Sequence, residues 1–305
     1  MAGVVYICCT SVGRYIIQSH LQNHPTIPIA GIVNLDRCAS AGKANFDSLY
    51  DLARDHEIDI LYCKNVNSPE VLSFIKQKQP LLAIQSGWSQ KFGEELLSLP
   101  KYGCLGEHPS PIPVGRGAAC VNWAIIEGQK EWGDSFFKMV EQYDAGPVYA
   151  QRNFLIEEHD DVRSVYEKVG FTSQRMIKDH LQHWYDGNFN PIALDETKAT
   201  HYPRRRPKDG ELDFSWDDDK IYNYVRALTK PYPGAYFLHQ EKKIFVWEAA
   251  KRPDASTGQS GQFTIDADSQ SLLVSTGNNK LIALRRLQAE GMPEIFGHEF
   301  FDNIQ

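Results

Sequence analysis

Short apolar runs alternate with helical patterns through the first hundred residues, and this alternation limits the fold more than any other feature of the chain. The runs rich in Val, Ile and Leu have the length of buried strands, and the segments between them carry apolar side chains at three- and four-residue spacing. We therefore expect strands at residues 4–9, 29–34, 58–63 and 81–87, and helices at residues 13–24, 45–57 and 68–79. Strands that alternate with helices build βαβ units, so the pattern predicts a Rossmann-like α/β fold with a doubly wound, mostly parallel sheet.

A polar stretch with three prolines around residues 185–210 interrupts this pattern, as a linker between domains does. Beyond it, the sequence predicts one helix at residues 217–230 and several short strands, with a hairpin turn at residues 276–280. We expect an α/β domain at residues 1–195, a linker at residues 196–210, and a smaller C-terminal β-rich, OB-like domain at residues 211–305.

Charge and composition exclude several classes of protein. The net charge of −7 argues against a chain that binds nucleic acid mainly through electrostatics. No apolar run approaches the ~20 residues of a membrane-spanning helix, and the apolar N-terminus lacks the basic region of a signal peptide. The six cysteines are scattered without a CxxC or Cys/His cluster, so we expect no metal site. Buried free thiols are typical of a reducing compartment, and we expect a cytoplasmic protein.

Ligands of parallel sheets bind beyond the carboxyl ends of the strands, and three polar segments follow predicted strands here: residues 9–14, 86–93 and 106–110. The first lacks the three glycines of a dinucleotide fingerprint, so we do not expect classical NAD binding. The third holds His108 next to Pro109, and proline fixes the backbone there in a rigid, non-helical turn.

A carboxylate follows at a second predicted strand end. An alternating strand from residue 136 is expected to end in Tyr143 and Asp144, before Gly146. A histidine and a carboxylate on neighbouring strand ends can form an oriented general base. Taken singly, a histidine such as His108 is as often structural as catalytic, and an aspartate such as Asp144 is more often a turn residue than a catalytic one. The hypothesis therefore depends on the pair.

Residues 99–148 resemble the core of the folate-dependent formyltransferases, which include methionyl-tRNA formyltransferase and the sugar N-formyltransferases that act on nucleotide-linked amino sugars. The family signature is Asn-x-His-(Pro/Gly)-Ser, then Arg-Gly, then Asp-x-Gly. Here His108, Arg116-Gly117 and Asp144 stand at the matching spacing. The similarity extends past the segment PYPGAYF at residues 231–237, and so it covers nearly the whole chain.

The resemblance implies transfer of a formyl group from N10-formyltetrahydrofolate to a primary amine. His108 would take the proton of the attacking amine, and Asp144 would orient the ring and stabilise the imidazolium. The family's Asn, two residues before the His, is replaced here by Gly106. A backbone N–H at Gly106 or Glu107, or a water in the vacated space, is expected to replace the missing donor. A slow enzyme and a binding protein that has lost catalysis remain the other readings.

The same resemblance assigns residues to the two substrates. Pterin contacts are expected in two segments, and an alternative packing role at a domain seam stays open for Trp88. Acceptor contacts are expected at the first strand end, in the Arg-Gly segment and in PYPGAYF. A structural role for Arg116, tying its loop to a carbonyl, stays open as the alternative. The folate-binding residues are Trp88, Ser89, Gln90, Val140, Gln142 and Asp144, and the acceptor-binding residues are Ser11, Arg116 and Tyr232.

The acceptor is expected to be small. From residue 201 onward, 14 Lys and Arg stand against 15 Asp and Glu, so the second domain offers no basic surface to a polynucleotide. The segment at residues 35–51 is also much shorter than the basic insertion of the tRNA enzyme. We therefore expect a nucleoside-diphosphate amino sugar destined for a surface polysaccharide. Another acceptor such as methionyl-tRNA, a formyltetrahydrofolate hydrolase, and a non-catalytic folate- or nucleotide-binding protein remain alternatives, and a homodimer stays open.

Overall fold

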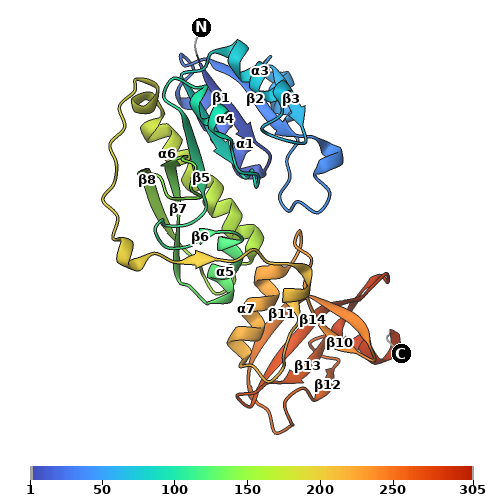
Figure 1. The fold of residues 1–305 in the computed structure, drawn as a ribbon. Coiled ribbons are helices and arrows are strands. Elements are labelled where there is room, and N and C mark those ends of the chain that lie inside the picture. Colours follow the sequence, from blue (N-terminus) through green and yellow to red (C-terminus); the bar gives the residue numbers. More distant parts are fainter. Residues whose placement is uncertain (1–2, 304–305) are drawn as a thin grey trace. The chain divides into compact units, whose positions relative to one another are not determined.

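A seven-stranded sheet in the order β3-β2-β1-β4-β5-β7-β8 is the scaffold of the first of two units in this computed structural model, which describes residues 3–303 (Figure 1). The first five of these strands along the chain are parallel, whereas β7 and β8 are antiparallel to their neighbours. This confirms the Rossmann-like, mostly parallel sheet. The strands are β1 (Val4–Cys8), β2 (Ile29–Leu35), β3 (Ile60–Cys63), β4 (Leu82–Ser86), β5 (Cys104–His108), β7 (Glu131–Lys138) and β8 (Val148–Leu155).

Helices cover both faces of this sheet. On one face α1 and α6 lie side by side, and the hydroxyl of Ser19 donates to the carbonyl of Gln174 at 2.7 Å. On the other face the core includes Val71 and Ile75 of α3. The predicted start of α3 is confirmed, because the side chain of Ser68 accepts the N–H of Val71. The helices are α1 (Ser11–Asn23), η1 (Arg37–Ala39), α2 (Tyr50–Asp55), α3 (Pro69–Lys78), α4 (Glu94–Ser98), α6 (Val162–Tyr185) and η2 (Glu196–Lys198), and a short ladder joins β6 (Arg116–Gly117) to β9 (His201–Tyr202).

The second unit is built on an antiparallel sheet in the order β10-β11-β14-β13-β12, which confirms the β-rich C-terminal domain. The predicted turn at residues 276–280 joins β13 to β14. The predicted helix is α7, and Asp217 caps it by accepting the N–H of Lys220 at 2.7 Å. The elements are η3 (Pro207–Gly210), α7 (Asp218–Leu228), β10 (Ala235–His239), β11 (Lys242–Ala255), β12 (Phe263–Asp266), β13 (Ser271–Ser275), β14 (Lys280–Ala289), β15 (Glu294–Phe296), η4 (Gly297–Glu299) and α8 (Phe300–Asn303).

The second unit also takes two segments from the middle of the chain, residues 118–130 with α5 (Cys120–Ile126) and residues 156–165. The amide of Asn122 in α5 donates to the carbonyl of Ala227 in α7 at 2.7 Å. Among residues 3–303, no helix combines the length and apolar character needed to cross a membrane.

The strand that leads toward Asp144 is shorter than predicted. β7 ends at Lys138, whose N–H donates to the carbonyl of Pro147 at 2.9 Å and closes a hairpin with β8. The expectation that residues 139–143 extend this strand is wrong, since the chain must leave the ladder to make this turn. Residues 139–147 therefore form a loop, and Asp144 lies within it.

Candidate active site

His108 is the last residue of β5, and its side chain is buried. Its Nε2 lies 2.9 Å from the carbonyl oxygen of Gly115. A carbonyl can only accept a hydrogen bond, so in the neutral ring Nε2 carries the hydrogen. The lone pair that could take a proton is then on Nδ1.

Asp144 is held by the residues that follow Gly115. Its carboxylate accepts the N–H of Gly117 at 3.0 Å, and its carbonyl accepts Nε of Arg116 at 2.8 Å. Its backbone is left-handed, with φ +50°, as in a tight turn. Residues 115–117 thus connect the two groups, since one end bonds the ring of His108 and the other bonds Asp144. A direct bond between the two side chains stays a prediction.

Arg116 is the anchor of this segment. Beyond its bond to Asp144, its guanidinium pairs with both carboxylate oxygens of Glu196 at 2.8 and 2.9 Å. The hydrogen bond with Glu196 raises the pKa of Arg116 and lowers that of Glu196. Arg116 therefore ties the β7–β8 loop to the segment around η2, the structural alternative to the expected contact with the acceptor.

The space beside Gly106 is not empty. Gly106 is paired with Phe137 across the β5–β7 ladder, and a Cβ on Gly106 would lie 2.8 Å from two ring carbons of Phe137. The ring packs in a cluster with Ile112 and Val148. The ring of Phe137 therefore takes up the space next to the Cα of Gly106, which disfavours a water there as the replacement donor. Because β5 is paired on both sides, with β4 and β7, the N–H groups of Gly106 and Glu107 also point into the sheet plane.

The residues expected to hold the pterin differ in exposure. Trp88 is buried in the core cluster, and its indole N–H donates to Oε1 of Gln90 at 3.1 Å. Gln90 also accepts the N–H of Val66, so it joins the loop after β4 to the loop after β3. These contacts give Trp88 a packing role within the core of the first unit. By contrast, Ser89 is exposed.

The β7–β8 loop presents the second expected pterin segment to solvent. Val140 is 41% exposed, and Gln142 is also exposed. Of the expected acceptor residues, Ser11 is half-buried at the first position of α1, and Tyr232 is half-buried in the second unit. The structure therefore brings His108, Asp144 and Arg116 together around residues 115–117.

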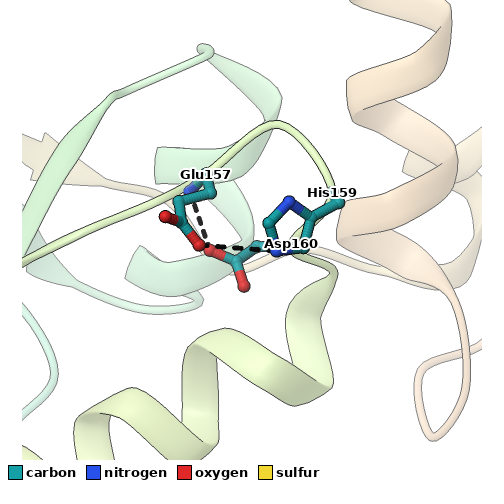
Figure 2. Close-up of side chains that lie close together, drawn as sticks. All are labelled: Glu157, His159 and Asp160. Carbon is teal, nitrogen blue, oxygen red and sulfur yellow. Dashed lines mark hydrogen bonds and ion pairs between the residues drawn. The ribbon is translucent and has the colours of Figure 1, made fainter.

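Glu157, His159 and Asp160 place ligand atoms within 4.8 Å of one another (Figure 2). The carboxylate of Asp160 accepts the N–H of Glu157 at 2.7 Å and the hydroxyl of Ser164 at 2.7 Å. These bonds close a turn just before α6, whose first N–H groups are capped by the neighbouring Asp161. The buried position of Asp160 thus has a structural explanation in this turn.

Sequence reasoning missed a buried acid pair. Glu107 and Asp134, on neighbouring strands, are 6% and 0% exposed. A signal was present: both acids stand within apolar strand segments, where a charged side chain is costly unless it is paired.

Comparisons with known proteins agree on one family. A family model described as "Formyl transferase" matches residues 10–181, and one described as "Formyl transferase, C-terminal domain" matches residues 205–305. Methionyl-tRNA formyltransferase of Caldanaerobacter subterraneus subsp. tengcongensis is 31% identical over 250 residues, which are 82% of this chain and 80% of that protein.

Two further similar proteins carry names other than methionyl-tRNA formyltransferase. The bifunctional polymyxin resistance protein ArnA of Wigglesworthia glossinidia brevipalpis is 31% identical over 218 residues, which are 72% of this chain but only 33% of that protein. The solved structure of WlaRD, described as a sugar 3N-formyl transferase in the presence of dTdp and 5-N-formyl-THF, superposes with a TM-score of 0.69. It shares 14% identity and covers 96% of this chain and 99% of WlaRD, so it supports the fold.

Proposed function

This chain belongs to the formyltransferase family, and we propose that it transfers a formyl group from N10-formyltetrahydrofolate to the primary amine of a nucleoside-diphosphate amino sugar. The observation that carries the proposal is the linked arrangement at the end of β5, where one short segment bonds both His108 and Asp144. The exposed side chains of the β7–β8 loop and of Ser89 offer polar and apolar contacts that fit a pterin ring.

The chain's own groups move the proton. The donor supplies the formyl carbon, and attack by the amine leaves a proton on its nitrogen. Nδ1 of His108 takes that proton, while the Nε2–H bond to Gly115 stabilises the imidazolium that forms. The same ring then returns the proton to the folate nitrogen as the bond to the formyl carbon breaks. Asp144 supports this cycle through Gly117, which keeps the Gly115 carbonyl in place.

Glycine at position 106 lacks the side-chain amide of the family's Asn, and this absence lowers the rate that we expect for formyl transfer. One oxyanion donor is typically worth about a hundred- to a thousand-fold in kcat. The Phe137 ring lies against the Cβ position of residue 106 and disfavours a substitute donor beside it, so we propose a slow transferase that uses donors elsewhere around the formyl oxygen.

Charge supports a small acceptor. Arg14, in the first turns of α1, pairs with Asp47 at 2.6 Å and with Asp51 at 2.8 Å, so its charge is already neutralised. Arg14 therefore offers little free charge to the phosphates of a tRNA stem. The WlaRD structure was solved with dTdp, and this also favours a nucleotide-linked acceptor. Cysteines without disulfides suit a reaction in the cytoplasm.

An acceptor screen tests the proposal. The protein is incubated with N10-formyltetrahydrofolate and, separately, with dTDP- and UDP-linked 3- and 4-amino sugars, initiator methionyl-tRNA, or no acceptor. Mass spectrometry then follows the gain of one formyl group, with His108→Asn as the matched control. Formylated nucleotide sugar, absent with the control, is expected. Formylated tRNA would overturn the acceptor class, formate without acceptor would indicate a hydrolase, and folate binding without turnover would indicate a binding protein.

A further inference from the structure

Two buried acids lie on the face of the sheet opposite His108. Side chains alternate along β5, so Glu107 points away from the side that carries His108. Glu107 is paired across the ladder with Phe136 of β7, and Asp134 stands two residues before Phe136. Asp134 is therefore on the same face as Glu107 and diagonal to it, a placement within reach of a long side chain.

Each carboxyl receives one hydroxyl and has one oxygen left over. Oε2 of Glu107 accepts the hydroxyl of Ser86 at 2.6 Å, and Oδ2 of Asp134 accepts the hydroxyl of Ser173 in α6. Oε1 of Glu107 and Oδ1 of Asp134 have no hydrogen-bond partner. Two neighbouring carboxylates cannot satisfy each other, because both only accept; one proton held between them satisfies both remaining oxygens.

The surroundings make a second negative charge costly. Burial raises the pKa of both carboxyls, and the charge of Glu107 raises that of Asp134 further. Within residues 3–303, the charged and titratable groups that act on the pair are the Cys8 thiol of β1 and the ring of His108; no lysine or arginine pairs with either acid. The thiol is neutral, since burial raises the pKa of Cys8 as well.

We propose that Glu107 and Asp134 share a single proton and form a buried monoanion that stabilises the protonated ring of His108 through β5. Both acids are positioning residues in this sense, because each acts on His108 from the opposite face of the sheet. The ring meets the Gly115 carbonyl on its own side, and the carboxylate of Asp144, in the β7–β8 loop, is bonded by Gly117. The shared proton stands on the burial and the unpaired oxygens of the two acids, whereas its benefit for catalysis rests on the proposed function.

The physical reason is the low dielectric of the sheet interior. A net charge that is buried one residue away from the ring is poorly screened, so it favours the imidazolium that forms when the amine loses its proton. A second buried negative charge would cost too much free energy, and without any charge only the Gly115 carbonyl would stabilise the imidazolium. A shared proton gives one charge in total.

The first experiment tests the shared proton without any activity. In the unfolded chain both acids are ionised at neutral pH, whereas the folded pair holds one proton. The raised folded pKa means that its stabilisation is greatest at low pH and is lost as pH rises. The equilibrium constant for urea unfolding should therefore rise more steeply with pH, between pH 6 and 8, in the wild type than in Glu107→Gln/Asp134→Asn, with about tenfold per pH unit as the limit for one proton. Parallel pH dependences would overturn the shared proton.

The second experiment tests the effect on His108. The titration of its ring is followed by NMR in ¹³C-histidine-labelled protein and assigned with His108→Gln. The single variant Asp134→Asn keeps a carboxylate at Glu107 with an amide donor beside it, so it retains one charge and serves as the matched control. The double amide variant loses the charge, and the titration midpoint of His108 should fall by about one pH unit relative to that control.

An unchanged midpoint in a folded double variant would overturn the coupling, even if the shared proton stands. If the double amide variant does not fold, Glu107→Leu/Asp134→Val replaces it, because buried polar pairs often yield to apolar side chains without loss of stability. Formyl transfer is not needed for either measurement. Failure of the proposed function would therefore appear in the acceptor screen and leave both results interpretable.

Discussion

Gly106→Ala should destabilise the protein mainly through its contact with the ring of Phe137. The added Cβ would stand 2.8 Å from two ring carbons and 3.1 Å from Cγ of Met139, and the ring is only 4% exposed. Overpacking of this kind costs about 1–3 kcal/mol, whereas replacing glycine reduces the entropy of the unfolded chain by roughly 0.4–1 kcal/mol. We expect a net loss of about 1–2 kcal/mol in the free energy of unfolding. Backbone strain contributes nothing, because Gly106 does not lie at positive φ.

A double-mutant cycle isolates this contact. Phe137→Leu alone should destabilise by leaving a cavity, and it should also make room for the new methyl group. Gly106→Ala/Phe137→Leu should therefore be more stable than the sum of the two single changes, by about 1 kcal/mol or more. Urea unfolding at one pH provides all four free energies. Wild-type stability for Gly106→Ala, or additive effects, would refute the argument that Phe137 occupies the place of a side chain.

Substitutions at Gly106 and Phe137 also test whether the site lacks an oxyanion donor. Gly106→Asn alone should lower stability and should not raise kcat, since the amide meets Phe137. In the Phe137→Leu background the amide has space on the face of β5 that carries His108. If an oxyanion donor is what the site lacks, kcat of Gly106→Asn/Phe137→Leu should exceed that of Phe137→Leu by up to about a hundred-fold. Equal rates would show that this site does not need an amide at that position.

His108→Asn should abolish formyl transfer with little change in the melting temperature, and more than about a tenth of wild-type activity would require a different base. Arg116→Lys loses the paired bonds to Glu196 and should lower kcat by at least about tenfold while KM for the folate changes less; Glu196→Gln, which keeps one acceptor, should be milder. Burial lowers the pKa of His20 to about 4, so its neutral form stabilises the fold above pH 6.5. About 3 kcal/mol of that stability should disappear between pH 6.5 and 4, and His20→Gln should flatten this loss in urea unfolding.

Local sequence patterns were sufficient to predict the elements whose ends depend on neighbouring residues. The strands of the parallel sheet end where polar residues begin, the hydroxyl of Ser68 starts α3, and the turn at residues 276–280 forms where Asn and Gly accumulate. The position of His108 at the end of β5 follows from the same rule, because a chain leaves a buried strand where prolines and polar residues begin.

What could not be predicted depends on partners distant in the sequence. Residues 139–143 alternate like a strand, and only the bond between Lys138 and Pro147 shows that the chain has already turned. The sequence does not reveal the carboxylate partner of Arg116, because Glu196 lies 80 residues away. Burial of Trp88 likewise depends on how the loops after β3 and β4 meet.

The antiparallel pairing of β5 with β7 explains how the sheet accommodates Gly106 in place of the family's Asn. Phe137 stands opposite Gly106 and packs against the place of its missing side chain, and on the other face Asp134 and Glu107 each keep one buried oxygen without a partner. A site that had merely decayed would leave a cavity beside Gly106. Here β7 supplies an apolar side chain at that place and, on the other face, the acid with which we propose that Glu107 shares a proton. We infer that the loss of the amide is accommodated by the strand pair as a whole, and that substitutions on β7, not only at Gly106, determine how this formyltransferase works.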